Sequence, residues 1–119
     1  MDCLFCKIAD GQIPSYTIYE DKWVKCFLDI HPESNGHLLI IPKQHFLDLD
    51  DIDLDTLNKI MVTAKKMKKL LEQKLNPIGI VILQNNGIGQ DIKHFHLHLK
   101  PVYSENKIKL VEEIFEKLK

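Results

Sequence analysis

Three histidines alternate with apolar residues near the C-terminal end of the chain, in the sequence His94-Phe95-His96-Leu97-His98. Successive side chains of a β-strand point to opposite faces, so we expect the imidazoles to share one face and the apolar side chains to enter a core. Histidines two residues apart on a strand are separated by roughly 6–7 Å. This separation suits the binding of one small anionic group or one metal ion.

Three interpretations of this histidine cluster compete. It could be a solvated strand face that happens to be rich in histidine, although three of the six histidines in the chain fall within these five positions. It could be a metal site, because neutral imidazole is a common metal ligand. It could also catalyse a reaction at phosphorus, in which one imidazole attacks, a second assists proton transfer, and neighbouring donors hold the phosphate oxygens. The first of these interpretations is the weakest.

Composition and charge limit the class of protein. A chain of 119 residues that is 45% hydrophobic and 28% charged is typical of one globular domain, and a formal net charge of −1 gives no overall field that would attract nucleic acid or an anionic membrane. No apolar run approaches the ~18 residues needed to span a bilayer, and the N-terminus lacks the pattern of a secretory signal. Three cysteines make a poor disulfide framework and favour a reducing compartment. We therefore expect a cytoplasmic protein, with a nuclear location also open, that binds neither nucleic acid nor membrane.

Hydrophobic patterning predicts the elements that must position these histidines. Apolar residues at helical spacing from Leu57 to Leu75 predict a long central helix, with N-cap candidates at residues 48–55 and a stop at Asn76-Pro77. Apolar residues between 110 and 118 predict a C-terminal helix. Aromatic, β-branched or short apolar runs predict strands at residues 16–20, 23–28, 37–42, 80–83 and 95–102.

These elements predict an α+β domain built on an antiparallel sheet of about five strands. Most of the expected strands are joined by hairpins or loops, and the long helix lies between them in the sequence. We expect residues 1–119 to form a single domain. A long hydrophobic strand at the edge of such a sheet needs to be covered or paired with a second subunit, which favours a homodimer.

The histidine cluster resembles the motif of the histidine triad (HIT) family, His-φ-His-φ-His-φ-φ with φ apolar. The likeness extends over nearly the whole chain through four further blocks in the family order, at residues 3–8, 27–30, 36–45 and 85–87. The pattern is most similar to the HINT branch, the nucleotide-binding proteins once called protein kinase C inhibitors, and to its bacterial relatives. The resemblance implies a homodimeric HIT-like fold that binds purine nucleoside monophosphates and hydrolyses nucleoside phosphoramidates, with AMP bound to an amine as the typical substrate.

The resemblance implies a role for four histidines. His96 is the expected nucleophile: one ring nitrogen attacks the α-phosphorus, displaces the amine and forms a phosphohistidine that water later hydrolyses. Its other nitrogen must donate a hydrogen bond, which a backbone carbonyl of the triad strand accepts in the family. His98 is expected to bind the phosphate and help protonate the leaving group, a task that favours a pKa near the working pH. His37 matches the family's supporting histidine, and His94 is expected to be a zinc ligand or a further support.

Positions outside the motif imply nucleotide contacts. Asp29 matches the carboxylate that accepts hydrogen bonds from the ribose hydroxyls, and Ile30 matches the apolar residue beside it. Asn85 and Gln90 match amides that contact the ribose or the phosphate. Gly89 belongs to a turn whose backbone N–H groups can approach the anion closely.

Two positions depart from the family pattern. The loop before the histidines is shorter than usual, and Asp91 stands where a Ser or Thr normally offers a hydroxyl to the phosphate. A carboxylate there would repel the substrate unless it is protonated, turned away or paired with a nearby base such as Lys93. Lys100 replaces the apolar residue expected after Leu99. The resemblance therefore leaves catalysis weakened or altered as an open outcome.

A second set of residues has the types expected of a zinc site. Cys3 and Cys6 form a Cys-x-x-Cys pair, and His45 and His94 complete a set of two thiolates and two imidazoles that matches zinc ligands in some bacterial relatives. Four such ligands make a closed tetrahedral set, which is typical of a structural Zn²⁺. The alternative is that both cysteines are small apolar residues of an N-terminal turn and that His45 caps a loop. A redox role for the pair ranks below both, because no βαβ pattern surrounds it.

Two classes of function remain open on the sequence. The favoured one is a hydrolase or transferase that cleaves nucleoside phosphoramidates through a nucleotidyl-His96 intermediate, with no organic cofactor. The other is a regulatory module that binds a purine nucleotide or zinc and has little turnover because of its altered loop. Cleavage of dinucleoside polyphosphates is a narrower third alternative.

Overall fold

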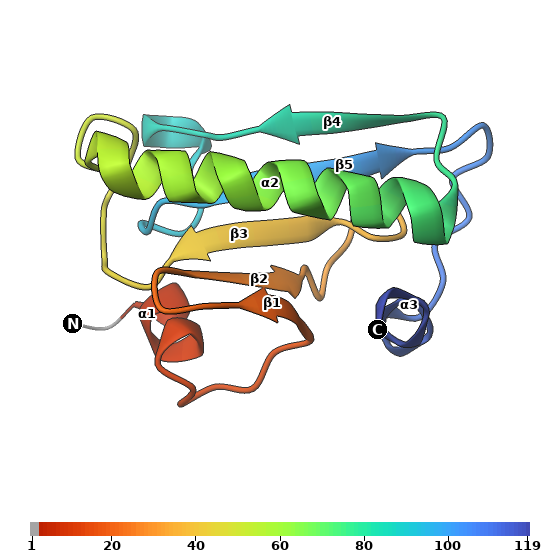
Figure 1. Cartoon of the computed structure of the whole chain (residues 1–119), viewed down its shortest axis with the longest axis horizontal. Coiled ribbons are helices and arrows are strands. Elements are labelled where there is room, and N and C mark those ends of the chain that lie inside the picture. The colour runs from red at the N-terminus through yellow and green to blue at the C-terminus, as the bar shows by residue number, and fades with distance from the viewer. Residues whose placement is uncertain (1–2) are drawn as a thin grey trace.

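Five antiparallel strands form one sheet in a computed structural model of the chain, which describes residues 3–119. Their spatial order is β1-β2-β3-β5-β4, and every neighbouring pair is antiparallel (Figure 1). The predicted α+β class and five-stranded antiparallel sheet are confirmed, with β1 and β4 at the two edges. The strands are β1 (Thr17–Glu20), β2 (Val24–Leu28), β3 (Leu38–Pro42), β4 (Gly79–Leu83) and β5 (Leu97–Val102).

The central strands separate two apolar layers, because alternate side chains enter opposite faces of the sheet. Every residue of β2 and β3 is buried. Cys26 and Ile40 belong to the larger core on one face, whereas Phe27 and Leu39 belong to a smaller cluster on the other. The smaller cluster forms one wall of the functional site described below.

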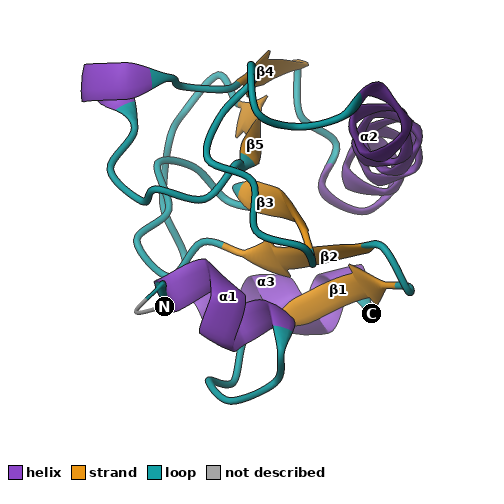
Figure 2. Cartoon of the chain, turned by 90° about the vertical axis from the view of Figure 1, so that its left-hand side faces the viewer, coloured by secondary structure: helices purple, strands orange, loops and turns teal. Residues whose placement is uncertain are grey.

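The long helix α2 (Leu54–Leu75) covers the face of the larger core (Figure 2). It begins after Asp53, whose carboxylate accepts a hydrogen bond from the N–H of Thr56, and it ends at Asn76 in a left-handed conformation. Both ends agree with the sequence analysis. The helix buries Ile60, Thr63, Ala64, Met67 and Leu71.

Two short helices complete the fold. The predicted C-terminal helix is α3 (Val111–Leu118), which packs Ile114 and Leu118 into the core beneath α2. Helix α1 (Leu4–Ala9) was not predicted, and it packs Phe5 and Ile8 on the opposite face of the sheet (Figure 2). Six residues are too few to show a helical period in the sequence. None of the helices within residues 3–119 combines the length and apolarity needed to cross a membrane.

The strand that carries the histidines begins later than the predicted residue 95. Strand β5 starts at Leu97, so only His98 of the three lies within it. Continuing the β3–β5 register by two residues places Pro42 opposite Phe95, and Pro42 has no N–H with which to extend the ladder. Phe95 instead donates its N–H to the carbonyl of Phe46 at 2.7 Å. The expected alternation persists, because Phe95 and Leu97 enter the core beneath α2.

Candidate active site

His96 has one ring nitrogen engaged and the other free to react. Its Nδ1 lies 2.7 Å from the backbone carbonyl oxygen of His94, and a carbonyl can only accept, so Nδ1 carries the proton. The lone pair therefore resides on Nε2. The ring of Phe5 stands edge-on to this imidazole, with 5.0 Å between the ring centroids. The tautomer and the packing together make Nε2 of His96 the available nucleophile.

A chain of hydrogen bonds fixes the proton of His98. The backbone N–H of Glu33 donates to Nδ1 of His37 at 3.2 Å, so His37 carries its own proton on Nε2. This Nε2 lies 2.9 Å from Nδ1 of His98 and donates to it. Neutral His98 therefore holds its proton on Nε2. His98 can thus act as a hydrogen-bond donor without being positively charged.

Burial keeps both of these histidines neutral at pH 7. It is the main reason that the pKa of His98 falls to about 4, and repulsion from Lys100 and from the protonated forms of His96 and His37 lowers this pKa further. Burial also lowers the pKa of His37, against the opposing effect of the Asp29 carboxylate. The sequence analysis favoured a pKa near the working pH for His98. A bound phosphate anion would raise the pKa of His98 towards that range.

A cavity of about 260 Å³ is lined in part by His96. The histidine itself is only 2% exposed. One wall is apolar and is formed by Phe5 and Ile8 of α1 and by Phe27 and Leu39 of the sheet. Few polar groups in an apolar cavity are typical of small-molecule sites. Five residues expected to contact a nucleotide line this cavity: Asp29, Ile30, Asp91, His96 and His98.

The other expected nucleotide contacts do not line the cavity. Gln90 is buried, and its Nε2 donates to the carbonyl of Leu47 at 2.6 Å. The side chain of Asn85 lies against Gly89, which belongs to a short 3₁₀ helix at residues 87–89. These residues shape the loop beside the site. Conversely, the sequence analysis gave no role to Phe5, although the family block at residues 3–8 includes it.

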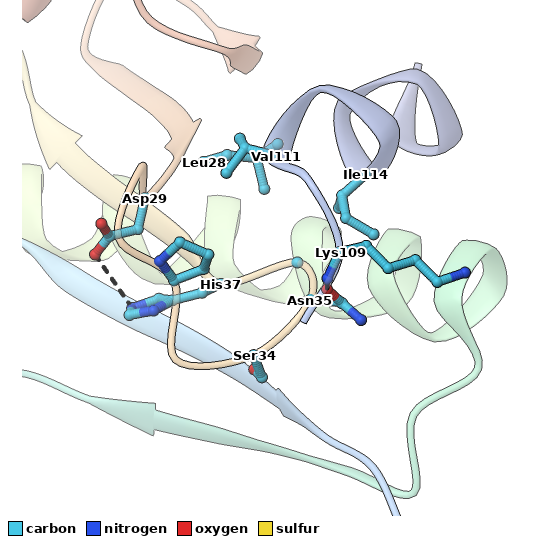
Figure 3. Close-up of a pocket in the computed structure, with 10 residues that line it drawn as sticks. Leu28, Asp29, Ser34, Asn35, His37, Lys109, Val111 and Ile114 are labelled. Atoms are coloured by element: carbon cyan, nitrogen blue, oxygen red, sulfur yellow. Dashed lines mark hydrogen bonds and ion pairs between the residues drawn. The ribbon is translucent and has the colours of Figure 1, made fainter. Parts of the chain in front are cut away.

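Asp29 and His37 form the closed end of the site. The Asp29 carboxylate accepts the backbone N–H of His31 at 2.9 Å through Oδ1, and its Oδ2 lies 3.7 Å from Nε2 of His37 (Figure 3). Behind them, Val111 and Ile114 of α3 leave a space of only about 10 Å³ (Figure 3). Such a space holds about one water molecule and is too small for a nucleotide.

Asp91 faces the nucleophile. Its Oδ1 lies 3.7 Å from Nε2 of His96 and also accepts the N–H of Ile92. The side chain is 85% exposed. Among the described residues, Lys93 does not pair with this carboxylate but donates to the carbonyls of Gly87 and Gln90. A carboxylate therefore lies beside the free ring nitrogen of His96.

The four predicted zinc ligands lie together, with all donor atoms within 4.8 Å of one another. Nδ1 of His94 is 3.5 Å from the sulfur of Cys3 and 3.4 Å from that of Cys6, and Nδ1 of His45 is 3.2 Å from the Cys6 sulfur. Zinc bond lengths of about 2.0–2.3 Å in a tetrahedron imply donor separations of about 3.3–3.8 Å. The donor types and their spacing therefore fit a tetrahedral Zn²⁺.

The protonation of this cluster is consistent with metal ligation by imidazole. His94 donates through Nε2 to the carbonyl of Pro42 at 2.9 Å, as metal-bound histidines commonly do, and this directs the Nδ1 lone pair to the thiols. Burial lowers the pKa of His94 to about 4. Burial and the adjacent Cys3 raise the pKa of Cys6 to about 11, so a cation would have to displace the thiol proton.

Comparison with known proteins decides the family, because the profile of the HIT domain matches residues 10–105. The chain belongs to the HIT family. It is 42% identical over 103 residues to an uncharacterized HIT-like protein of Methanocaldococcus jannaschii, covering 85% of this chain and 79% of that protein. It is 43% identical over 105 residues to the adenosine 5'-monophosphoramidase of Saccharomyces cerevisiae, covering 87% of this chain and 64% of the yeast protein.

A solved HIT structure also resembles this protein closely. The Zn-bound histidine triad family protein from Mycobacterium smegmatis matches with a TM-score of 0.90 and 32% identity, over 99% of this chain and 91% of that one. In the present HIT protein, His94 contacts both the cysteine cluster and His96. Its ring belongs to the cysteine cluster, and its carbonyl oxygen holds His96.

Proposed function

We propose that this HIT protein cleaves nucleoside phosphoramidates, such as AMP linked to an amine, through a nucleotidyl-His96 intermediate. The observation that carries the proposal is the unprotonated Nε2 of His96 beside a cavity that also contains Asp29 and His98. Similarity to the yeast adenosine 5'-monophosphoramidase supports this substrate class. The same intermediate, attacked by an acceptor other than water, would make the protein a nucleotidyl transferase.

In this proposal the purine nucleoside occupies the cavity. Its base lies against the apolar wall and Ile30, and its ribose hydroxyls donate to the carboxylate of Asp29. The expected contacts from Asn85, Gly89 and Gln90 are not part of this arrangement, because none of the three lines the cavity and the Gln90 amide is used within the fold. The phosphate lies between His96 and His98.

The first chemical step exchanges one bond at phosphorus for another. Nε2 of His96 forms a bond to the α-phosphorus while the bond from phosphorus to the amine nitrogen breaks, and that nitrogen takes the electron pair. A bound phosphate raises the pKa of His98, and the imidazolium form of His98 passes its Nε2 proton to the departing amine and becomes neutral. His37 lies 2.9 Å from Nδ1 of His98, and the Asp29 carboxylate beside His37 stabilises the positive charge of this pair before the transfer.

The second step releases the nucleotide. A water molecule attacks the phosphorus, the bond to Nε2 of His96 breaks, and the water proton returns to the His98–His37 pair. The backbone carbonyl of His94 stabilises the imidazolium character of His96 during both steps, because it accepts the Nδ1 proton. His94 and His37 therefore position the residues that touch the substrate.

We further propose that Cys3, Cys6, His45 and His94 hold a structural Zn²⁺, which would brace α1 against the segment before β5. No organic cofactor is required by the proposed chemistry. We also propose a homodimer of the HINT branch. The three free cysteines favour a cytoplasmic location.

Rapid quenching of a reaction with an adenosine phosphoramidate tests the proposed function. We expect AMP release and a transient adenylyl mass on the protein. In His96→Ala we expect AMP binding to persist, the adenylyl mass to disappear and turnover to fall at least about 10³-fold. Turnover that survives this substitution would refute the assignment of the nucleophile.

A nucleotide-binding module with little turnover is the second candidate function. The Asp91 carboxylate favours it, because a negative charge 3.7 Å from the nucleophile opposes an incoming phosphate. The same experiment separates the two functions. AMP binding without AMP release or adenylyl mass would establish the binding module.

A further inference from the structure

A second groove lies along β4 and β5. Its lining residues on β5 follow His98 in the strand, in the direction opposite to His96. Leu83 pairs with His98, and Val81 pairs with Lys100, so the groove begins beside His98 and follows β5. Its volume is about 380 Å³. Its lining includes Glu33, Ser34, Val81, Leu83, Lys100 and Val102.

Lys100 brings a positive charge to this groove. It lies two residues after His98, on the same face of β5, and its charge contributes to the lowered pKa values of His98 and His37. Nζ of Lys100 donates to Oε2 of Glu33 at 2.6 Å. An ammonium group has three donors, so Lys100 can bind a further acceptor besides this one.

The polar groups around Lys100 leave room for a ligand. The Lys100 side chain is 19% exposed, whereas that of Glu33 is 68% exposed and can turn into solvent. Ser34 also lines the groove and is buried, and its hydroxyl has no hydrogen-bond partner among the described residues. This hydroxyl has almost no accessible surface, and Ser34 also lines the space of about 10 Å³ behind Asp29, so Lys100 is the donor that a ligand in the groove can reach.

The proposed reaction directs the leaving group towards this groove. An attacking and a leaving atom lie roughly in line across phosphorus, so the amine departs away from His96. His96, His98 and Lys100 are spaced two residues apart in the chain. Two residues of a strand cover roughly 6–7 Å. A leaving group that takes its proton from His98 therefore meets the groove next.

We propose that this groove is the leaving-group subsite and that Lys100 selects leaving groups with an anionic end, a carboxylate or a phosphate, on an apolar linker. This inference rests on the proposed phosphoramidate hydrolysis. Val81, Leu83 and Val102 supply apolar surface for the linker. Lys100 supplies the charged donor for the anion.

Adenosine phosphoramidates that differ only in the end of the linker test this subsite. The amines are 6-aminohexanoate, hexylamine and 1,6-diaminohexane, which end in a carboxylate, a methyl group and an ammonium group. We expect kcat/KM for the carboxylate substrate to exceed that for hexylamine roughly tenfold, as one charge-assisted hydrogen bond allows. Diadenosine triphosphate, whose leaving group is a nucleotide, tests phosphate as the source of the anion.

Substitutions at the ion pair test the role of Lys100 through the ratio of these kcat/KM values. Lys100→Leu and Lys100→Gln should bring the carboxylate-to-hexylamine ratio close to one. Glu33→Gln should raise the ratio, because it removes the competing carboxylate. Lys68→Leu is the matched control, since Lys68 is also ion-paired, to Glu72 at 2.9 Å on α2, and should leave the ratio unchanged.

The outcomes separate the subsite from the proposed function. The subsite is overturned, while cleavage itself stands, if neither the carboxylate substrate nor diadenosine triphosphate shows an advantage over hexylamine that Lys100→Leu and Lys100→Gln remove. A Lys100-dependent gain for diadenosine triphosphate alone supports the subsite and identifies phosphate as the anion. Failure to release AMP from every substrate, including unsubstituted adenosine phosphoramidate, overturns the proposed function and the subsite together.

Discussion

His94 shows how closely the nucleophile depends on the cysteine cluster. Its ring is held at both nitrogens, by the carbonyl of Pro42 and by the sulfurs of Cys3 and Cys6. Its backbone oxygen then fixes the tautomer of His96. A rigid ring at position 94 therefore restricts the orientation of the His96 imidazole, the proposed nucleophile.

Replacement of one thiol should release the metal. We expect the purified protein to hold about one zinc ion per chain and Cys6→Ser to weaken its affinity by at least about tenfold, because a thiolate ligand is lost. A colorimetric zinc assay against a competing chelator measures both. Cys26→Ala is the control, since Cys26 is a buried thiol of the core beneath α2. A zinc-free wild type without affinity for the ion would contradict the site.

Asp91 should limit the affinity for the substrate. Its carboxylate lies 3.7 Å from Nε2 of His96, and a charge pair at about 4 Å costs on the order of 1 kcal/mol in water. Asp91→Asn keeps the shape and removes the charge, so we expect KM for adenosine phosphoramidate to fall roughly fivefold at low salt. The gain should shrink as salt is added. An unchanged KM at every salt concentration would show that the carboxylate moves aside when substrate binds.

Secondary-structure boundaries were predicted correctly where they depend on residues that are close together in the sequence. The two ends of α2 were predicted because Asp53 and Asn76 act on their own neighbours in the chain. The start of β5 was not, because it depends on Pro42 in another strand. The loop from Gln84 to Gln90 was predicted as a turn, but the inward direction of the Gln90 side chain depends on Leu47. Both of these features therefore depend on contacts between residues far apart in the sequence.

The chain leading into β5 buries imidazoles, and this should make the fold sensitive to acid. The pKa values of His94 and His98 are both lowered to about 4, whereas an unfolded chain titrates near 6.5. Between these values the unfolded state binds more protons, so the free energy of unfolding falls as the pH falls from about 6.5 to 4. Each histidine contributes a loss on the order of 3 kcal/mol.

Urea unfolding of chelator-treated protein between pH 7.5 and pH 4.5 measures this dependence. His98→Asn removes one titrating group, so we expect its stability to decline less steeply with acid than that of the wild type. Above pH 7 both proteins should show little pH dependence from this source, because the histidines are neutral in the folded and the unfolded state alike. An equal acid slope in the two proteins would contradict the lowered pKa of His98.

In the molecule as a whole, the two faces of the sheet carry different structures. One face carries α2 and the larger core, and the other carries α1, the cavity and the cysteine cluster. Figure 2 shows α2 on one side of the strands and α1 with the loop before β5 on the other. The two edges of the sheet differ as well. Strand β1 has an irregular register and ends in Glu20, whereas β4 pairs regularly along one side and contains no charged residue.

The outer edge of β4 should therefore pair with a second copy of the chain. Ile82 is 41% exposed, and Ile78 just before the strand is 73% exposed. Unpaired strand edges with exposed apolar side chains associate, so we expect sedimentation to give twice the chain mass of 13.9 kDa at micromolar concentration. Ile82→Glu should shift the protein to monomer. Trp23→Glu, at an equally exposed apolar side chain beyond β1, should leave the dimer intact, and a monomer from this control instead would place the interface at the opposite edge.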